Sequence, residues 1–312
     1  MNIVVFPAQR LPFYIDTTRR FRVWSWHHLT LLHHQPKMAS TPAHLEPSKL
    51  GTREYWATLY TTELTNNAQN PEDRGTVWFD DSDAESKLLT YLEDLTESAP
   101  FDHSLRQADA TFLDLGCGNG SLLFALRDEG WAGRALGVDY APQSVELARR
   151  IAAQRQQDAA TATKEDEDMS DAPPAGGEDD EADAREPEFE EWDVLNGPWE
   201  IVLNGPQKDG WDVVLDKGTF DAICLSDEKD AQGRRICEGY RGRALRLVKP
   251  GGLLLITSCN WTEEELRKWF ESPSNEGDVG KFVAVGKVDY PSFTFGGAKG
   301  QTISSLCFQR QA

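Results

Sequence analysis

The stretch TFLDLGCGNGSLLFAL, residues 111–126, contains an apolar run that ends in a carboxylate, three glycines within five positions, and a second apolar run of helical character. Glycine adopts backbone conformations that other residues avoid and allows a ligand to approach the main chain closely. The N-terminus of a helix adds free backbone N–H groups at the same place. The stretch therefore predicts a strand that turns sharply into a helix beside a bound ligand.

Strand-like segments recur along the rest of the chain. They are predicted at residues 111–115, 134–138, 188–194, 211–215 and 251–257, with helices between most of them. Strands and helices in alternation indicate a parallel sheet that is covered on both faces. The last two runs, KFVAVGKVDY and QTISSLCFQR, have no helix between them and predict a C-terminal antiparallel strand pair. The expected fold is α/β and doubly wound, with a seven-stranded, mostly parallel sheet.

The composition excludes several classes of protein. The chain has 312 residues and a net charge of −20, and it offers no basic stripe of the kind that binds nucleic acid. Its apolar runs are far shorter than the roughly 20 residues that span a bilayer. Five scattered cysteines without a CxxC pair predict neither a disulfide framework nor a zinc site, and they suit a reducing compartment. No metal site is predicted.

The chain divides into one domain with two additions. Residues 1–47 are predicted to be a poorly ordered N-terminal extension. Their basic first part, residues 1–37, is expected to be either disordered or an over-extended gene prediction rather than a mitochondrial signal. The domain covers residues 48–312 and begins with lid helices within 48–100. An acidic, low-complexity insertion at about 158–187 cannot bury enough apolar surface to fold, so it is predicted to be a solvated loop.

The glycines do not match the dinucleotide fingerprint. That fingerprint is G-x-G-x-x-G, whereas Gly116, Gly118 and Gly120 form G-x-G-x-G. Asp114 stands two residues before the first glycine, where its carboxylate could meet a positively charged amino group. S-adenosylmethionine carries such a group and a dinucleotide does not.

Two further acids follow the next two predicted strands. Asp139 ends one strand and could accept hydrogen bonds from both ribose hydroxyls of either ligand. Asp193 ends the following strand, within reach of an adenine amino group. Acids at three successive strand ends favour S-adenosylmethionine, although each could instead be a turn or cap aspartate.

Several motifs resemble those of known proteins. LDLGCGNG, GVDY and LVKPGG, together with the strand alternation, resemble the seven-strand, Rossmann-like methyltransferases. Five more motifs resemble the fungal and animal family that methylates a lysine of translation elongation factor 1-alpha. They are LGTREYWATLYTTEL, VWFDDSDAESKLLTYL, DKGTFDAICLS, TSCNWTEEEL and FTFGGAKGQTISSLCFQR, in this order over about residues 48–312. The acidic insertion and the extended N-terminus depart from the family's pattern.

The resemblance implies a protein-lysine N-methyltransferase with S-adenosylmethionine as cofactor and elongation factor 1-alpha as protein substrate. A cytoplasmic protein is expected, with the nucleus as a second location. No coiled-coil pattern argues for a dimer, so a monomer is the default. The cofactor is expected to contact the glycine loop, the three acids and their neighbours, namely Asp114, Gly116, Cys117, Gly118, Asn119, Gly120, Asp139, Tyr140, Asp193, Val194 and Trp78.

The same resemblance places substrate-facing residues in DKGTFDA. Asp216 is expected to hold the lysine amine, with Lys217 and Phe220 shaping the entrance. The alternative is that Asp216 caps the turn that follows. Trp56 and Tyr60 are four residues apart on a predicted helix and therefore share a face. They could line the lysine channel or belong to the core, and Trp78 has the same two interpretations.

Two other functions fit the sequence less well. A small-molecule or other-protein methyltransferase could use the same fold, because fold alone does not determine the substrate. A non-catalytic module could instead dock basic proteins through the acidic loop. The retained glycine loop and acids argue against this second alternative, since a module without catalysis does not need them.

Overall fold

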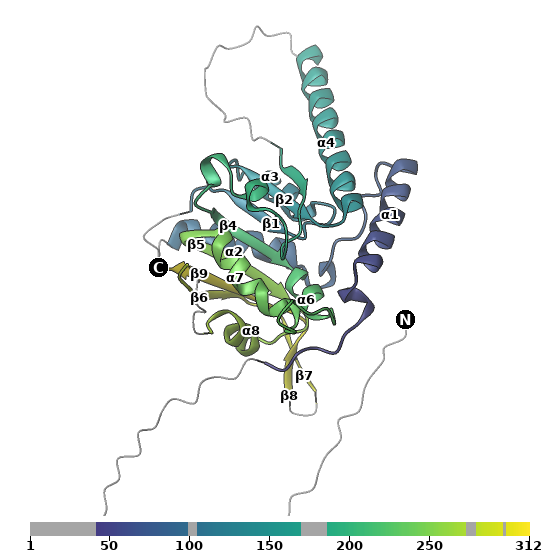
Figure 1. Cartoon of the computed structure of the whole chain (residues 1–312). Coiled ribbons are helices and arrows are strands. Elements are labelled where there is room, and N and C mark those ends of the chain that lie inside the picture. Colours follow the sequence, from purple (N-terminus) through teal and green to yellow (C-terminus); the bar gives the residue numbers. More distant parts are fainter. Residues whose placement is uncertain (1–41, 99–104, 170–185, 273–278, 296–297) are drawn as a thin grey trace, which may run out of the picture. The chain divides into compact units, whose positions relative to one another are not determined.

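The computed structural model describes residues 42–98, 105–169, 186–272, 279–295 and 298–312 (Figure 1). All of them belong to one compact unit, Ala39–Ala312. Most of the predicted N-terminal extension, residues 1–41, lies outside the described residues. No helix within the described ranges is long and apolar enough to cross a membrane.

A seven-stranded sheet forms the centre of the unit. Its strands lie in the order β3-β2-β1-β4-β5-β9-β6. The first five are parallel to their neighbours, whereas β9 runs antiparallel to both β5 and β6. The bounds are β1 Phe112–Leu115, β2 Ala135–Asp139, β3 Glu188–Glu191, β4 Trp211–Lys217, β5 Val248–Ser258, β6 Lys281–Val288 and β9 Ser304–Gln311. The predicted fold class is confirmed.

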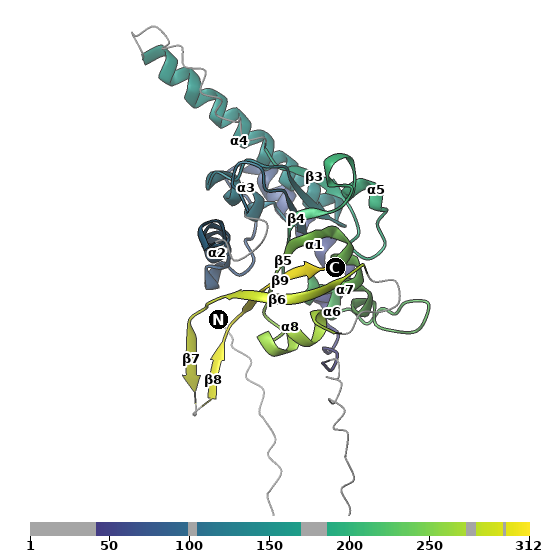
Figure 2. The ribbon, with the colours of Figure 1, turned by 90° about the vertical axis from the view of Figure 1, so that its left-hand side faces the viewer.

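A second, two-stranded ribbon was not predicted. It consists of β7, Ser292–Phe295, and β8, Ala298–Gln301, which extend away from the main sheet (Figure 2). The final run predicted as one strand, residues 301–310, corresponds to β9 apart from its first three residues, of which Gln301 ends β8.

Alternating side chains build a core on each face of the sheet. In β4, Val213 and Leu215 belong to one buried cluster and Val214 to the other. The first cluster includes side chains of α1 Arg53–Gln69, α2 Ala84–Ser98, α3 Ser121–Asp128 and α4 Pro142–Met169. The second includes side chains of α5 Trp199–Val202, α6 Thr219–Cys224, α7 Tyr240–Leu247 and α8 Glu263–Phe270. Helices thus cover both faces, as the alternation of strands and helices predicts.

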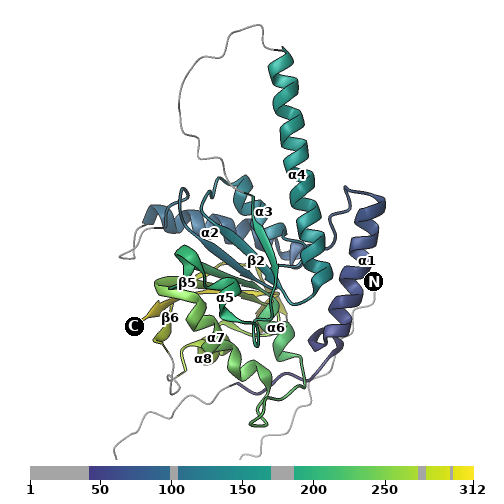
Figure 3. The same cartoon turned by 45° about the horizontal axis from the view of Figure 1, so that its top comes forward.

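Helix α4 corrects the predicted start of the acidic loop. The sequence predicts a loop from about residue 158, but α4 continues to Met169 and projects beyond the sheet (Figure 3). Between Gln143 and Met169 the chain has no glycine or proline, and it is rich in alanine, glutamine and glutamate, which favour helix. The insertion's residues 170–185 lie outside the described residues.

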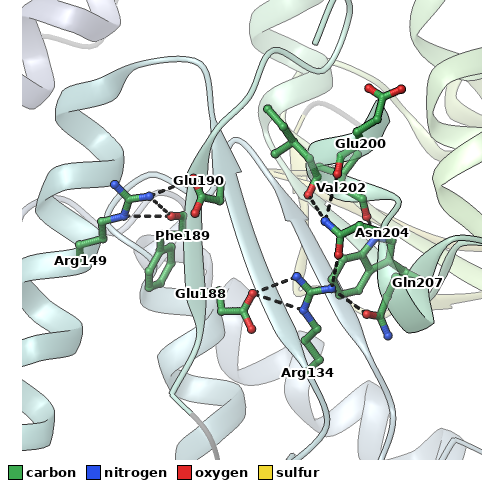
Figure 4. Close-up of polar contacts among 11 residues, drawn as sticks. Arg134, Arg149, Glu188, Phe189, Glu190, Glu200, Val202, Asn204 and Gln207 are labelled. Carbon is green, nitrogen blue, oxygen red and sulfur yellow. Dashed lines mark hydrogen bonds and ion pairs between the residues drawn. The ribbon is translucent and has the colours of Figure 1, made fainter. Parts of the chain in front are cut away.

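Arginines hold β3 at the edge of the sheet (Figure 4). Arg134 lies 2.9 Å from a carboxylate oxygen of Glu188. Arg149 of α4 pairs with Glu190 at 3.0 Å and donates two hydrogen bonds to the carbonyl of Phe189. These contacts fix the strand that precedes Asp193, and so they position one of the predicted site residues.

Candidate active site

The glycine loop joins β1 to α3 as predicted. Gly116, Gly118 and Gly120 all have positive φ, at 67°, 57° and 82°. A Cβ atom on Gly116 would lie 2.1 Å from the hydroxyl oxygen of Thr219, and one on Gly118 would lie 2.7 Å from that of Tyr60. Only glycine combines this conformation with such close approach. The three glycines are therefore required by the shape of the loop.

Asp139 ends β2 and is bound to the glycine loop. Its carboxylate accepts hydrogen bonds from the N–H of Gly118 at 3.3 Å and from the N–H of Ala141 at 2.9 Å. Burial raises the pKa of Asp139, and hydrogen bonds from Ala141, Ser144 and Gly118 act in the opposite direction. The carboxylate is thus fixed at the carboxyl edge of the sheet, where doubly wound folds bind ligands.

Asp193 lies two residues beyond β3 and pairs with an arginine that the sequence analysis missed. One oxygen accepts hydrogen bonds from the N–H groups of Leu195, at 2.8 Å, and Asn196, at 3.2 Å. The other oxygen pairs with the guanidinium of Arg53, which stands 4.4 Å from the ring centre of Tyr140. Burial alone would raise the pKa of Asp193, but the Leu195 N–H and the charge of Arg53 outweigh it and lower the pKa.

Asp114 is the most perturbed of the three acids. It is 3% exposed, and burial raises its pKa to about 8. The charge of Lys217 opposes this shift, while Glu85 and the other carboxylates nearby add to it. Lys217 itself donates a hydrogen bond to the carbonyl of Trp78 at 3.0 Å and stands 3.4 Å from Glu85.

A cavity opens along the carboxyl ends of the parallel strands. It is lined by many of the predicted site residues, namely Trp56, Tyr60, Trp78, Gly116, Asp139, Tyr140, Asp193, Val194 and Lys217. The other predicted residues are not among the described residues that line it. They are Asp114, Cys117, Gly118, Asn119, Gly120, Asp216 and Phe220. Asn119 instead supports the neighbouring segment, because its side-chain amide donates to the carbonyl of Arg74 at 2.8 Å.

Aromatic side chains of α1 and the following loop form one wall of the cavity. The rings of Trp56 and Tyr60 stack with centres 6.3 Å apart, and Trp78 lies 5.2 Å from Trp56. Tyr60 also belongs to the buried core, and burial raises its pKa well above its ordinary value. The two interpretations of this helix face are therefore compatible, since one face both packs on the core and lines the cavity.

Asp216 occupies a different place from the one expected. It is 1% exposed, and its carboxylate accepts hydrogen bonds from the N–H groups of Thr219 and Phe220, at 2.9 and 3.0 Å, and from the hydroxyl of Tyr240. This geometry is the capping role that the sequence left as its alternative. The alternation along β4 explains it, because Asp216 points to the face of α6 and α7 while Lys217 points to the cavity.

Phe220 is likewise a core residue and not part of the entrance. It is 1% exposed, and its ring centre lies 5.0 Å from that of Tyr240 and 5.2 Å from that of Phe270. Its expected role at the entrance is therefore corrected.

We expect the variant Tyr240→Phe to be less stable by about 2 kcal/mol, because it removes a hydrogen bond to a buried carboxylate that has no access to water. Urea denaturation at pH 8 measures this loss of stability. Burial raises the pKa of Asp216 to about 7, so the carboxyl group is mostly ionised at that pH. Affinity for the cofactor should change less than twofold. A variant as stable as the wild type would contradict the buried hydrogen bond from Tyr240 to Asp216.

The sequence analysis also missed residues at the ends of β4 and β5. Asp221, Cys259 and Asn260 line the cavity there. Asp221 belongs to the motif DKGTFDA, but nothing in the local sequence distinguishes it from Asp216. The pairing of Arg53 with Asp193 was equally hidden, since 140 residues separate them.

The strand order, the glycine loop and the acid at the end of β2 define a doubly wound, nucleoside-binding enzyme fold. The chain matches the family described as "Methyltransferase domain" over residues 106–297. Its class is therefore that of the methyltransferases.

Curated relatives narrow the class. Protein-lysine N-methyltransferase EFM4 of Saccharomyces cerevisiae is 37% identical over 270 residues, which cover 86% of this chain and 98% of the relative. EEF1A lysine methyltransferase 2 of Homo sapiens is 30% identical, over 85% of this chain and 88% of the relative. The chain belongs to this family of protein-lysine N-methyltransferases. Among solved structures, magnesium protoporphyrin IX methyltransferase (ChlM) from Synechocystis PCC 6803 with bound SAM is 16% identical, with a TM-score of 0.41, over 81% of this chain and 97% of that one.

Proposed function

We propose that this protein transfers methyl groups from S-adenosylmethionine to a lysine of translation elongation factor 1-alpha. The observation that carries the proposal is the family membership, with 37% identity to yeast EFM4 over 98% of that protein. Human, mouse and zebrafish relatives are named for the lysine methylation of EEF1A. The cavity contributes an independent argument, because its lining residues suit both a nucleoside and a lysine.

The donor and acceptor set of the cavity fits S-adenosylmethionine. Asp139 is proposed to accept hydrogen bonds from the ribose hydroxyls, and Asp193 from the adenine amino group. The positive-φ glycines leave the backbone beside Gly116 open to the ligand. Asp114, buried behind the glycine loop, is proposed to attract the amino group, whose positive charge favours the ionised form of this carboxylate. When bound, S-adenosylmethionine supplies a methyl group on a positively charged sulfur, which is an activated leaving group.

The protein's own contribution is to orient and desolvate the substrate amine. A lysine amine has a pKa of about 10.4 in water and must lose its proton before it attacks. The wall formed by Trp56 and Trp78 excludes water, and removal from water lowers the pKa of an amine. Alignment of the two reactants in one cavity supplies much of the remaining rate enhancement. The protein therefore needs no nucleophile of its own.

Three further features belong to the proposal. The elongation factor acts as a protein partner, the enzyme works as a monomer, and it is located in the cytoplasm, with the nucleus as a second location. The net charge of −20 supports a partner with basic surface more than it supports nucleic acid.

Incubation of the full chain with labelled S-adenosylmethionine and purified elongation factor 1-alpha tests the proposal. We expect label on one lysine, located by mass spectrometry, and none with the variant Asp139→Asn. Label on small metabolites but not on the factor would contradict the substrate and favour the small-molecule alternative.

A further inference from the structure

Asp221 is a buried carboxylate that faces the cavity. It lies in the first turn of α6, is 4% exposed and lines the cavity at the ends of β4 and β5. One of its oxygens accepts a hydrogen bond from the hydroxyl of Ser258 at 2.5 Å, and the other from the N–H of Cys259 at 2.8 Å. Ser258 is the last residue of β5, so the carboxylate is held in place from a second element.

Neutral donors face the rest of the carboxylate. An ionised carboxylate has about four lone-pair sites. The bonds from Ser258 and the Cys259 N–H use one site on each oxygen, and the Cys259 thiol and the Asn260 side chain are further donors to it. Because a hydrogen bond from a charged group is stronger than one from a neutral group, an ammonium group inside the cavity can displace these two side chains.

The cations of the cavity are already paired with other acids. Of the described residues that line it, Arg53 and Lys217 are the positively charged ones. Arg53 pairs with Asp193, and Lys217 pairs with Glu85. A buried charge without an opposite charge is costly, so Asp221 is suited to a cation that comes from outside the chain.

The other acids of the cavity have different partners or positions. Asp139 holds the glycine loop at the end of β2, and Asp193 is bound to Arg53. Glu228 also lines the cavity, but its side chain is exposed to water, where an ion pair contributes little. Asp221 is thus the buried acid at the β4 and β5 end, opposite the part of the cavity that suits the nucleoside.

The surroundings of Asp221 fit a long aliphatic side chain. Ile223 and Leu225, which follow it, line the same cavity, as does Ile236 of the next helical segment. An amine on a four-carbon stem would place its methylenes against these apolar side chains and its charge at the carboxylate. A hydrogen bond between an ammonium group and a carboxylate is about twice as strong as one between neutral groups.

We propose that Asp221 binds the amine of the substrate lysine and selects it against neutral side chains. This inference rests on the proposed function, and it assigns to Asp221 the role that the sequence analysis expected of Asp216. The bond orients the amine before its proton is lost, so the residue is a substrate-binding one.

The variant Asp221→Asn tests the inference, because asparagine has the same shape without the charge. We expect the KM for elongation factor 1-alpha to rise at least tenfold, and the affinity for the factor in the presence of S-adenosylhomocysteine to fall by a similar factor. The affinity for S-adenosylhomocysteine, measured by calorimetry, should change less than twofold. The matched control is Asp227→Asn, which removes the same charge from an exposed neighbour and should change the KM less than twofold.

An unchanged KM in a folded Asp221→Asn variant would overturn the inference, and so would an equal loss of cofactor affinity. If the variant does not fold, competition experiments on the wild-type protein test the inference instead. n-Butylammonium should compete with the elongation factor for binding, whereas 1-butanol should not. Equal effects of the two compounds would also overturn it. Failure of the wild type to label the factor would refute the proposed function instead, so the two failures are distinguishable.

Discussion

Replacing Asp139 by asparagine should weaken the binding of S-adenosylmethionine about 100-fold. A hydrogen bond to a charged group contributes about 1.5–3 kcal/mol, and two such bonds to the ribose hydroxyls correspond to about 3 kcal/mol or more. The carboxylate also accepts bonds from Gly118 and Ala141, so its loss disturbs the glycine loop at the same time. Isothermal titration calorimetry measures the change directly.

The matched control is Asp158→Asn in α4. Asp158 is exposed and accepts a hydrogen bond from the side-chain amide of Gln154 at 2.7 Å. It carries the same charge but lies outside the residues that line the cavity. Its replacement should leave the dissociation constant within twofold of the wild type. Equal losses in the two variants would refute the assignment of Asp139 to the cofactor.

Replacing Asp114 by asparagine should change how the free energy of unfolding depends on pH. Burial raises the pKa of Asp114 to about 8 in the folded protein, whereas an unfolded aspartate has a pKa of about 3.9. The folded state therefore binds this proton more tightly. The contribution of this protonated group to the free energy of unfolding is fully present below pH 4 and is lost as the pH rises toward 8. Asparagine does not ionise and avoids this loss.

We expect the difference in unfolding free energy between Asp114→Asn and the wild type to shift in favour of the variant by about 3 kcal/mol from pH 5 to pH 8. Urea denaturation at several pH values measures it, and the difference between the two proteins cancels the contributions of other groups. Affinity for S-adenosylmethionine should fall at the same time, a trade of function against stability. Parallel stability curves would show that the pKa of Asp114 is not raised.

The parallel part of the sheet could be predicted because its signals are local. Most of its strands contain a short apolar run, with β3 (Glu188–Glu191) as the exception, and the glycine loop marks where β1 ends. The β7–β8 ribbon was missed because each strand has only four residues and the second, Ala298–Gln301, has no alternation of apolar and polar side chains. The end of α4 was missed because acidic composition was given more weight than the absence of glycine and proline.

The site was predictable on its nucleoside side and less so on its substrate side. Asp139 and the glycines follow from spacing along one strand–loop–helix unit and the next strand. Asp216 and Asp221 are both acids of one short motif, and only the packing of α6 decides which one faces the cavity. The pairing of Arg53 with Asp193 depends on the tertiary fold and has no local signature.

A crystal structure of the protein with S-adenosylhomocysteine would show directly where the nucleoside binds. We expect the ribose hydroxyls to lie within hydrogen-bond distance of the Asp139 carboxylate, with the nucleoside against the glycine loop. We also expect the thioether sulfur to face the end of the cavity that contains Asp221. A nucleoside bound elsewhere, or bound without contact to Asp139, would contradict this placement of the cofactor.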